Sequence, residues 1–198
     1  MTVAKTIEFW FDFGSNYSYI SAMRIEALAR PAGISVEWKP FMLGPIFKSF
    51  GWESSPFVLQ KQKGEYTWTD MERQCRKYGI PWKKPSAFPR AAVYPMRVAA
   101  ANEGAAWLPE FCRRTFRANF VEDRDINSND FVAALLDGMG EPGQAIVAAA
   151  QQEPAKSRLR EQSDRAAQRG IFGAPTFFVA GEMYWGNDRL DDALARLA

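Results

Sequence analysis

The stretch IEFWFDFGSNYS, residues 7–18, decides the fold of this chain. Its first half is mostly apolar and aromatic, which is typical of a buried β-strand, and we expect that strand over residues 5–13. Gly14 ends the strand, and a helical pattern follows over residues 18–30. A helix that begins directly after a buried strand leaves its first N–H groups free and points its positive dipole end outward. The turn at residues 14–18 is therefore predicted to bind an anion.

A thiolate suits this turn, because charge-assisted hydrogen bonds and a helix N-terminus both favour the ionised form of a thiol. The turn holds Ser15 and Ser18 but no cysteine. The hydroxyl of Ser15 can donate a hydrogen bond to a thiolate without supplying a sulfur of its own. We infer that the sulfur comes from a bound small molecule, for which glutathione is the first candidate. A serine that only caps the helix is the structural alternative.

Strands are predicted at the two ends of the chain. Residues 34–38 form a short apolar strand pattern after the first helix, and the order strand, helix, strand implies a parallel right-handed crossover. Near the C-terminus, residues 176–180 and 183–185 are predicted to form an antiparallel pair joined by a tight turn. A terminal helix is expected to begin at Asn187 or Asp188.

The long middle of the chain is predicted to be helical, because Pro and Gly divide it into helix-length segments. The segments expected to be helices are residues 55–79, 89–103, 105–120, 128–138, 142–152 and 155–169. Neither end of the chain can form a sheet alone. We therefore predict an α/β fold in which residues 1–41 and 171–198 form one domain, interrupted by an all-helical insertion domain at residues 42–170.

Composition and charge exclude several classes of function. The 198 residues carry a formal net charge of +2, and no dense basic cluster indicates nucleic-acid binding. Histidine is absent, which removes Ser-His-Asp and Cys-His catalytic groups and imidazole metal ligands, so we expect no metal. The aromatic content of 14% favours an aromatic-lined pocket, although an aromatic-rich core would have the same composition.

The chain is expected to be cytoplasmic, with no membrane partner. It begins without a signal-peptide pattern, and no apolar run approaches the roughly 20 residues that span a bilayer. Its two cysteines, Cys75 and Cys112, fit no C-x-x-C or metal-ligand spacing and would stay reduced in that compartment. We expect both to be structural, because a free cysteine usually packs as a small apolar side chain.

Four motifs carry a resemblance that covers nearly the whole chain. They are FDFGSNYSY at residues 11–19, LGPIFK at residues 43–48, FGAPT at residues 172–176 and WGNDRL at residues 185–190. With these motifs, the chain resembles the kappa-class glutathione transferase and 2-hydroxychromene-2-carboxylate isomerase family, a DsbA-like branch of the thioredoxin superfamily. The resemblance implies a thioredoxin-like fold with a helical insertion between an N-terminal βαβ unit and a C-terminal ββα unit. It also implies glutathione as cofactor and a homodimer.

The same resemblance implies roles for residues within the motifs. Ser15 would be the catalytic residue and would contact the glutathione sulfur. Ala174 and a cis proline at Pro175 would pair with the cysteinyl backbone of glutathione. Asn187 and Asp188 would hold its γ-glutamyl end, with Asp188 taking the α-ammonium. Helix caps and an ordinary turn proline are the structural alternatives.

Other residues of the insertion are candidates for contacts with ligand carboxylates or with an aromatic ring. Lys63 is a candidate for the glycyl carboxylate of glutathione and Lys48 for the substrate carboxylate, because an ammonium at the edge of a cleft attracts anions. Phe47, Trp52 and Tyr94 are candidates to shape a pocket for a flat aromatic acid. Solvated lysines and helix-packing aromatics are the alternatives.

Two positions depart from the family pattern. Asn16 replaces the proline that usually follows the serine, which is expected to loosen the first helical turn slightly, because proline suits the first helical position. Trp52 replaces the asparagine of a Gly-Asn pair, which removes an amide side chain. Both departures leave the substrate preference open.

The resemblance implies a glutathione-dependent cis-trans isomerase of 2-hydroxychromene-2-carboxylate or a related acid of aromatic-hydrocarbon breakdown. The thiolate would add transiently to a conjugated double bond of the substrate. A kappa-class-like transferase that releases a stable conjugate is the alternative, and a module that only binds a partner is a third. A thiol–disulfide oxidoreductase ranks last, since Ser15 and Ser18 provide no cysteine pair.

Overall fold

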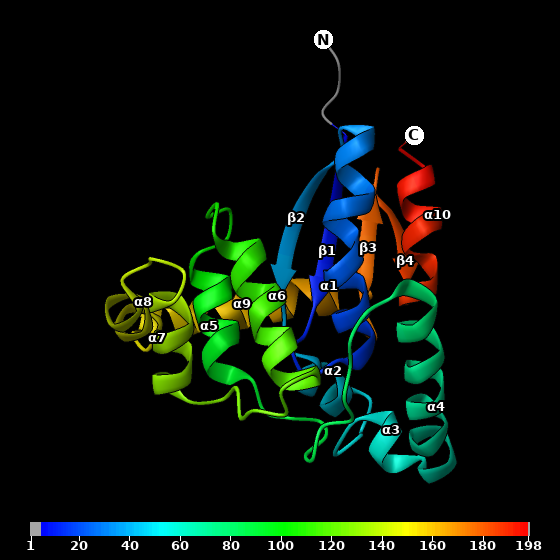
Figure 1. Cartoon of the computed structure of the whole chain (residues 1–198), viewed down its shortest axis with the longest axis horizontal. Helices are drawn as coiled ribbons and strands as arrows, with labels where there is room; N and C mark the ends of the chain where they lie inside the picture. The colour runs from blue at the N-terminus through cyan, green and yellow to red at the C-terminus, as the bar shows by residue number, and fades with distance from the viewer. Residues whose placement is uncertain (1–4, 198) are drawn as a thin grey trace.

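The computed structural model describes residues 5–197, which are built around a four-stranded mixed sheet (Figure 1). In sequence order, the strands are β1 (Thr6–Phe11), β2 (Ser35–Pro40), β3 (Thr176–Val179) and β4 (Glu182–Trp185). Their order across the sheet is β2-β1-β3-β4. β1 pairs in parallel with β2 and antiparallel with β3, which pairs antiparallel with β4. The two ends of the chain therefore share one sheet, as the sequence predicts.

Alternate residues of β1 enter two cores on opposite faces of the sheet. Ile7, Phe9 and Phe11 belong to the larger core. Trp10 points the other way and belongs to a smaller core that also contains Phe178 of β3. Because successive side chains of a strand point to opposite faces, this one aromatic run serves both cores.

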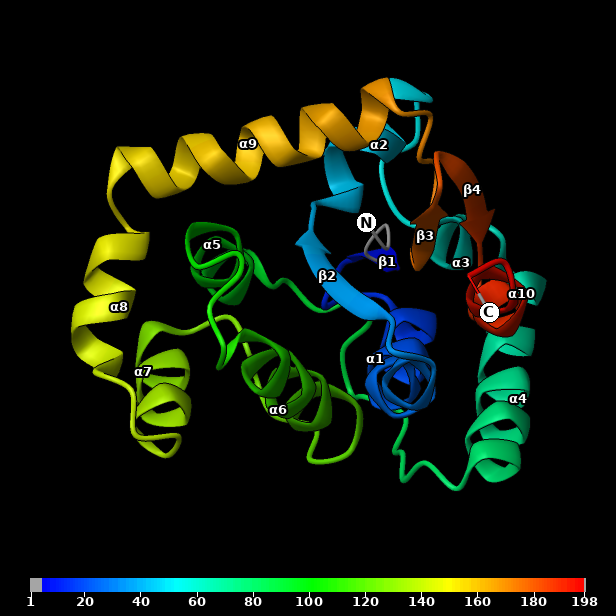
Figure 2. The ribbon, with the colours of Figure 1, turned by 90° about the horizontal axis from the view of Figure 1, so that it is seen from above.

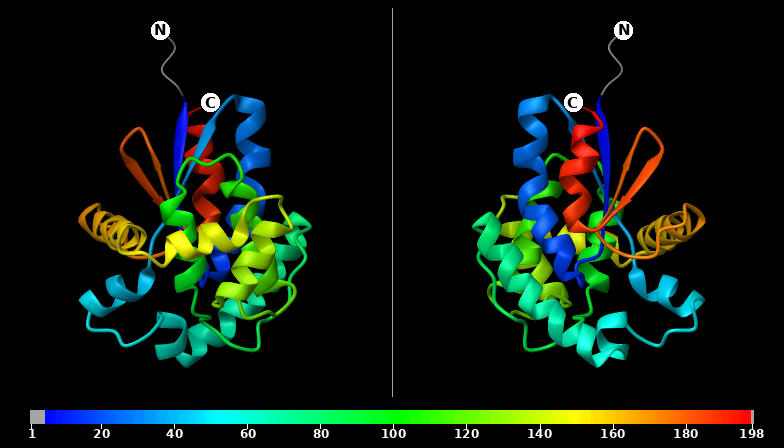
Figure 3. Two further views of the ribbon diagram at one scale, coloured as in Figure 1. Left: turned by 90° about the vertical axis from the view of Figure 1, so that its left-hand side faces the viewer. Right: turned by 90° about the vertical axis from the view of Figure 1, so that its right-hand side faces the viewer.

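Helices cover both faces of the sheet (Figure 3). On one face lie α1 (Asn16–Ala29) and α10 (Leu190–Ala195), which contact each other. The chain enters α10 through a short 3₁₀ helix, η2 (Asn187–Arg189). The smaller core on the other face is closed by α2 (Leu43–Ser49) and by the end of α9 (Glu153–Gln168).

The helical insertion surrounds α1 on two sides (Figure 2). Its remaining helices are α3 (Pro56–Leu59), α4 (Lys61–Tyr78), α5 (Val93–Ala101), α6 (Leu108–Phe120), α7 (Asn129–Asp137) and α8 (Gly143–Ala150). Both α4 and α6 contact α1, and they lie on opposite flanks of it. No helix within residues 5–197 is long and apolar enough to cross a membrane.

The helices of the insertion differ from prediction at three places. The helix expected over residues 55–79 is broken at Gln60, whose extended backbone (φ −112°, ψ 93°) separates α3 from α4. The helix expected over residues 89–103 begins only at Val93, because the preceding segment is irregular and held by side-chain contacts described below. The short helix α2 has no counterpart among the predicted segments.

Candidate active site

Ser15 joins the first turn of α1 to a loop from the other end of the chain. It is the N-cap residue, and its Oγ accepts a hydrogen bond from the Ser18 N–H at 3.2 Å. The same hydroxyl donates to the carbonyl oxygen of Ala174 at 2.9 Å. The Ala174–Pro175 peptide bond is cis, as the resemblance implies. The start of α1 and the loop before β3 thus meet at one buried serine.

Asp12 fixes the turn that carries Ser15. Its Oδ1 accepts from the Gly14 N–H at 2.8 Å, and its Oδ2 accepts from the Leu43 N–H at 2.9 Å. Burial raises the pKa of this carboxyl group, and the two backbone hydrogen bonds act in the opposite direction. Asp12 therefore binds the serine turn to the first residue of α2. The sequence analysis did not identify Asp12, although an acidic residue in an apolar strand is itself a signal, since a buried carboxyl group needs partners.

A cavity of about 970 Å³ opens beside Ser15. It is bordered by the serine turn, α2, α4, the segment before α5 and the loops that flank β3 and β4. The predicted site residues that line it are Ser15, Phe47, Lys48, Lys63, Ala174, Asn187 and Asp188. The fold therefore brings together most of the side chains that the motifs single out.

Three predicted site residues, Pro175, Trp52 and Tyr94, do not line this cavity. Trp52 packs against Phe47 at 5.8 Å and Phe50 at 5.5 Å between ring centroids, and its side chain is 37% exposed. Tyr94 lies in the first turn of α5, where its backbone N–H donates to Oδ1 of Asn127 at 3.2 Å. Trp52 supports Phe47 rather than forming the wall itself.

An aromatic pair that the sequence analysis did not identify stands at the cavity wall. Phe172 and Trp185 both line the cavity, and their ring centroids are 4.7 Å apart. Both residues are exposed, at 41% and 51%. A Cβ on Gly173 would lie 2.4 Å from the indole nitrogen of Trp185, so only glycine fits beneath that ring. Each of these aromatics is the first residue of a motif, at residues 172–176 and 185–190, and this position could have identified both as candidate site residues.

Asn187 and Asp188 lie in different surroundings. Asn187 is buried, and its Oδ1 accepts from Ser21 Oγ at 3.0 Å and from Arg24 at 3.3 Å. The Asp188 side chain is 69% exposed and forms an ion pair with Arg189 at 3.3 Å. Asn187 thus fixes η2 against α1, while Asp188 lies at the rim of the cavity.

A hydrogen-bonded chain forms the wall on the α4 side. Asn16 Nδ2 donates to Thr67 Oγ1 at 3.1 Å, and Thr67 donates to the Tyr17 hydroxyl at 3.3 Å. The Tyr17 hydroxyl donates to Asp70 Oδ2 at 2.7 Å. Burial, helped by nearby Asp70, raises the pKa of Tyr17, so this phenol keeps its proton. Asn16 therefore does more than replace a proline, because its amide attaches α4 to the first turn of α1.

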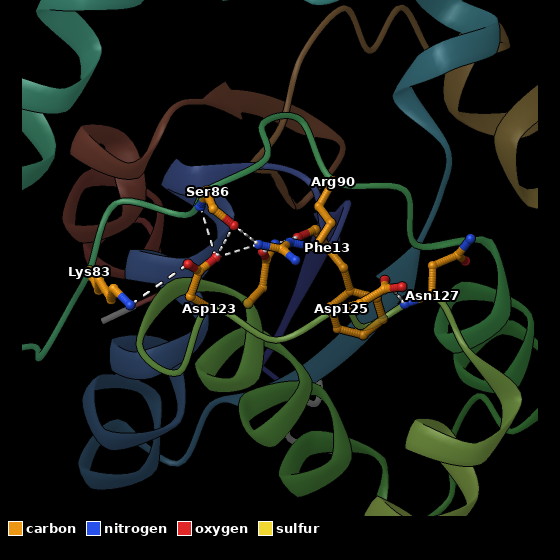
Figure 4. A network of polar contacts seen from close by, with 8 residues as sticks. Phe13, Lys83, Ser86, Arg90, Asp123, Asp125 and Asn127 are labelled. Carbon is orange, nitrogen blue, oxygen red and sulfur yellow. Dashed lines mark hydrogen bonds and ion pairs between the residues drawn. The ribbon is translucent and has the colours of Figure 1, made fainter.

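Arg90 holds the segment before α5 in place (Figure 4). Its guanidinium pairs with Asp123, and its Nε donates to Asn119 Oδ1 at 3.1 Å. Asn119 in turn donates to the Phe13 carbonyl at 3.0 Å. Ser86 also donates to Asp123, through its N–H at 2.8 Å and its hydroxyl at 2.9 Å. Arg90 also borders the cavity, but its charge is already paired with Asp123.

Comparison with known families decides the classification. The model of the DsbA-like thioredoxin domain matches residues 6–198. The chain belongs to this family.

Within the DsbA-like thioredoxin family, the chain is similar along its length to proteins with named activities. It is 29% identical to a 2-hydroxychromene-2-carboxylate isomerase of Sphingobium xenophagum, with 96% of each chain covered. It is 25% identical to glutathione S-transferase kappa 1 of Rattus norvegicus, covering 94% of this chain and 88% of that protein. A solved 2-hydroxychromene-2-carboxylate isomerase superposes with a TM-score of 0.87 at 27% identity, over 97% of this chain and 95% of that one.

The cysteines of this DsbA-like domain lie in the protein interior. Cys75 and Cys112 are both buried and unpaired. Burial raises the pKa of Cys75 to about 12 and that of Cys112 well above its ordinary value. Neither lines the cavity. The serine turn therefore has no thiol of the chain beside it, and among residues 5–197 no group of His, Cys, Asp and Glu side chains is arranged to hold a metal.

Two lysines are the free cations of the cavity. Of the described cavity residues, Lys48 and Lys63 form no ion pair, whereas Arg90 and Arg189 are paired with aspartates. An unpaired ammonium beside a cavity is suited to a ligand carboxylate. The ligand groups that Lys48 and Lys63 bind stay a prediction.

Proposed function

We propose that this DsbA-like domain is a glutathione-dependent cis-trans isomerase that acts on 2-hydroxychromene-2-carboxylate or a closely related aromatic acid. One observation carries the proposal. The Ser15 hydroxyl caps α1 and lies 2.9 Å from the Ala174 carbonyl oxygen, beside a cavity of about 970 Å³. Similarity to named isomerases over 96% of the chain supports the same reaction class.

The donors around Ser15 fit glutathione by their chemistry. Ser15 Oγ accepts from the Ser18 N–H, whereas no backbone acceptor among the described residues takes the N–H groups of Asn16 and Tyr17. Together with the Ser15 hydroxyl, these two N–H groups suit a thiolate. Ala174 offers backbone groups for a peptide, and Lys63 offers an ammonium for a carboxylate. The cavity volume falls at the upper end of the range of about 300–1,000 Å³ for small-molecule sites. When bound, glutathione supplies a thiolate that adds reversibly to a conjugated double bond.

The contribution of the chain is electrostatic and positional. Ser15 and the positive end of α1 stabilise negative charge on a sulfur, so they lower the pKa of a bound thiol. Asp12 holds the serine turn through two backbone hydrogen bonds, so the donors need little rearrangement during the reaction. Lys48 binds and orients the carboxylate of the aromatic acid near Ser15.

A kappa-class-like transferase is the second candidate, and the similarity to the rat kappa transferase over 94% of the chain favours it. The two candidates differ in what happens to glutathione. An isomerase leaves the total glutathione concentration constant, whereas a transferase consumes it in a stable conjugate.

The test is to incubate the protein with 2-hydroxychromene-2-carboxylate, with and without glutathione, and to follow substrate and glutathione together. We expect isomerisation only when glutathione is present, at constant total glutathione. A conjugate that accumulates with product would favour the transferase, and isomerisation at full rate without any thiol would contradict both candidates.

A further inference from the structure

The peptide group between Phe13 and Gly14 is held by a side chain at each of its polar ends. Its carbonyl oxygen, on Phe13, accepts from Asn119 Nδ2 at 3.0 Å. Its N–H, on Gly14, donates to Asp12 Oδ1 at 2.8 Å. A peptide group is planar, so two bonds at opposite ends fix the rotation of the whole plane. This plane directly precedes Ser15, and its rotation sets the direction in which the chain enters α1.

Asn119 reaches this peptide group from α6 and is 1% exposed. Its Nδ2 donates to the Phe13 carbonyl, while its Oδ1 accepts from Arg90 Nε at 3.1 Å (Figure 4). A guanidinium can only donate and a backbone carbonyl can only accept, so one orientation of the amide satisfies both neighbours. The reversed amide would place oxygen against oxygen and N–H against N–H. Arg90 therefore selects the orientation in which Asn119 donates to the serine turn.

Arg90 is itself a fixed donor. Its guanidinium pairs with Asp123, and its side chain is 10% exposed. The backbone of Arg90 also lies directly against the serine turn, since a Cβ on Gly14 would lie 3.2 Å from the Arg90 carbonyl oxygen. Asp123 has a left-handed backbone (φ 55°), which aspartate adopts more readily than most residues. The direction of the Arg90 guanidinium is thus set by the fold.

The position of these bonds matters for the chemistry proposed at Ser15. Donors stabilise a developing or resident anion most when they already point at it and need no rearrangement. The Ser15 hydroxyl and the first N–H groups of α1 follow the fixed peptide plane directly in the chain. A rotation of that plane would turn all of these donors together. A side chain that prevents the rotation therefore acts on the sulfur without touching it.

We propose that Asn119, oriented by Arg90, is a positioning residue that fixes the peptide plane before Ser15 and so holds the donors of the serine turn toward the sulfur. The proposal rests on the proposed function, which places the glutathione thiolate beside Ser15. Asn119 does not line the cavity. Its effect reaches the ligand only through the turn.

The test measures the pKa of a thiol at residue 15 in the Ser15→Cys protein, from alkylation rates against pH and without glutathione. Asn119→Leu has a similar volume and removes the donor to Phe13. It is expected to raise this thiol pKa and to slow alkylation about 10-fold at a pH below both pKa values, because a pKa higher by about one lowers the thiolate fraction tenfold. At a pH above both values the rates should be similar. Every variant keeps Asp12, whose carboxyl group also borders the turn.

Arg90→Lys tests whether Arg90 acts through Asn119. Lysine keeps a positive charge for Asp123 but lacks the fixed second donor of a guanidinium. The variant should raise the thiol pKa, and it should have no further effect in the Asn119→Leu protein. It also tests the proposal if Asn119→Leu does not fold.

Thr115→Val is the matched control. Thr115 is buried on α6 one turn before Asn119, and its hydroxyl donates to the Phe111 carbonyl of the same helix at 2.9 Å. Its replacement disturbs α6 without changing a contact of the serine turn, so the thiol pKa should stay unchanged. A thiol pKa raised equally by Thr115→Val would contradict a positioning role of Asn119.

The same change is then made in the protein that keeps Ser15, with glutathione as the thiol. Asn119→Leu should lower kcat about 10-fold below the pKa of the bound thiol and much less above it, while the KM of the aromatic acid stays nearly unchanged. A loss of kcat that is equal at all pH values would indicate a merely structural role and contradict the inference.

The inference is wrong if Asn119→Leu leaves the pKa of the thiol at residue 15 unchanged, or if the effects of Arg90→Lys and Asn119→Leu add in full. A wild-type protein that binds no glutathione would overturn the proposed function and with it the role of Asn119 in catalysis. The thiol at residue 15 would still decide whether Asn119 positions the turn.

Discussion

The Ser15 hydroxyl donates to the carbonyl oxygen of Ala174 at 2.9 Å, although the two residues are 159 positions apart. This bond joins the helix start that follows β1 to the loop that precedes β3. A hydroxyl hydrogen can rotate to another acceptor, so the same group can serve a thiolate. The Ala174 carbonyl is then free to accept an N–H of a bound peptide. Ser15 is thus placed to exchange its hydrogen bond to Ala174 for one to a bound ligand.

Ser15→Cys should convert the turn into a reactive thiol site. The helix N-terminus lowers cysteine pKa values from about 8.5 to roughly 3.5–7.5 in comparable positions. Cys75 and Cys112 should contribute little to the alkylation signal, because burial raises the pKa of both thiols. Alkylation rates followed against pH should show one new thiol that titrates below 8. A new thiol that titrates like a free cysteine would show that the turn does not stabilise negative charge.

Asn16 and Thr67 should behave as one energetic unit. Asn16→Ala and Thr67→Val each remove the 3.1 Å bond between α1 and α4, and each should lower the free energy of unfolding by about 1 kcal/mol. The double variant should lose less than the sum of the two, as measured by urea denaturation. Strictly additive losses would mean that the bond contributes nothing. Asn16→Pro should keep the helix start, since proline suits the first helical position.

The sequence predicts the strand and helix that carry the site better than it predicts the side-chain contacts that hold them in place. The strand around Phe9 and the helix capped by Ser15 follow from local patterns, namely an apolar run, a glycine and a capping side chain. The resemblance places Ser15 and Ala174 at one ligand, but their direct hydrogen bond was not predicted, because nothing local links positions so distant. The bonds of Asn16 to Thr67 and of Tyr17 to Asp70 depend on how α4 packs, which local patterns do not determine.

The side-chain contacts of Arg90 are likewise not determined by local sequence patterns. Arg90, Asn119 and Asp123 lie on two segments whose approach depends on the tertiary fold. For this reason, the helix expected over residues 89–103 begins only at Val93. A helical pattern describes the residues, but the side-chain contacts of Arg90 hold residues 89–92 outside the helix.

Asp123 should make stability depend on acid pH. Hydrogen bonds from Ser86, first from its N–H, together with the charge of Arg90 lower the pKa of Asp123 below its ordinary value of 3.8. A carboxyl group with a lowered pKa stabilises the folded state above its unfolded pKa, and this contribution is lost as pH falls through the folded pKa. Asp123→Asn should therefore be less stable than the wild type at pH 7, and the difference should shrink below about pH 4. Urea unfolding at both pH values measures this, and a difference that does not change with pH would contradict the assignment.

Lys63 and Lys48 should affect different ligands. Lys63→Met should weaken glutathione about 10-fold and leave the KM of the aromatic acid nearly unchanged at saturating glutathione. Lys48→Met should raise that KM about 10-fold with little effect on glutathione affinity. Lys61→Met is the matched control, because Lys61 lies in the same turn of α4 as Lys63 but does not line the cavity. The assignment is wrong if the two effects are exchanged or if Lys61→Met has the same effect.

The most direct test of the role of Ser15 compares Ser15→Ala with Ser18→Ala. Ser18 Oγ is buried without a hydrogen-bond partner among the described residues, so its loss should leave activity intact. Ser15→Ala should still bind glutathione, but the pKa of the bound thiol, read from thiolate absorbance, should rise. Turnover of 2-hydroxychromene-2-carboxylate should fall about 10²-fold to 10³-fold, the usual loss when one donor to a developing anion is removed. A Ser15→Ala protein with unchanged thiol pKa and full turnover would contradict the account.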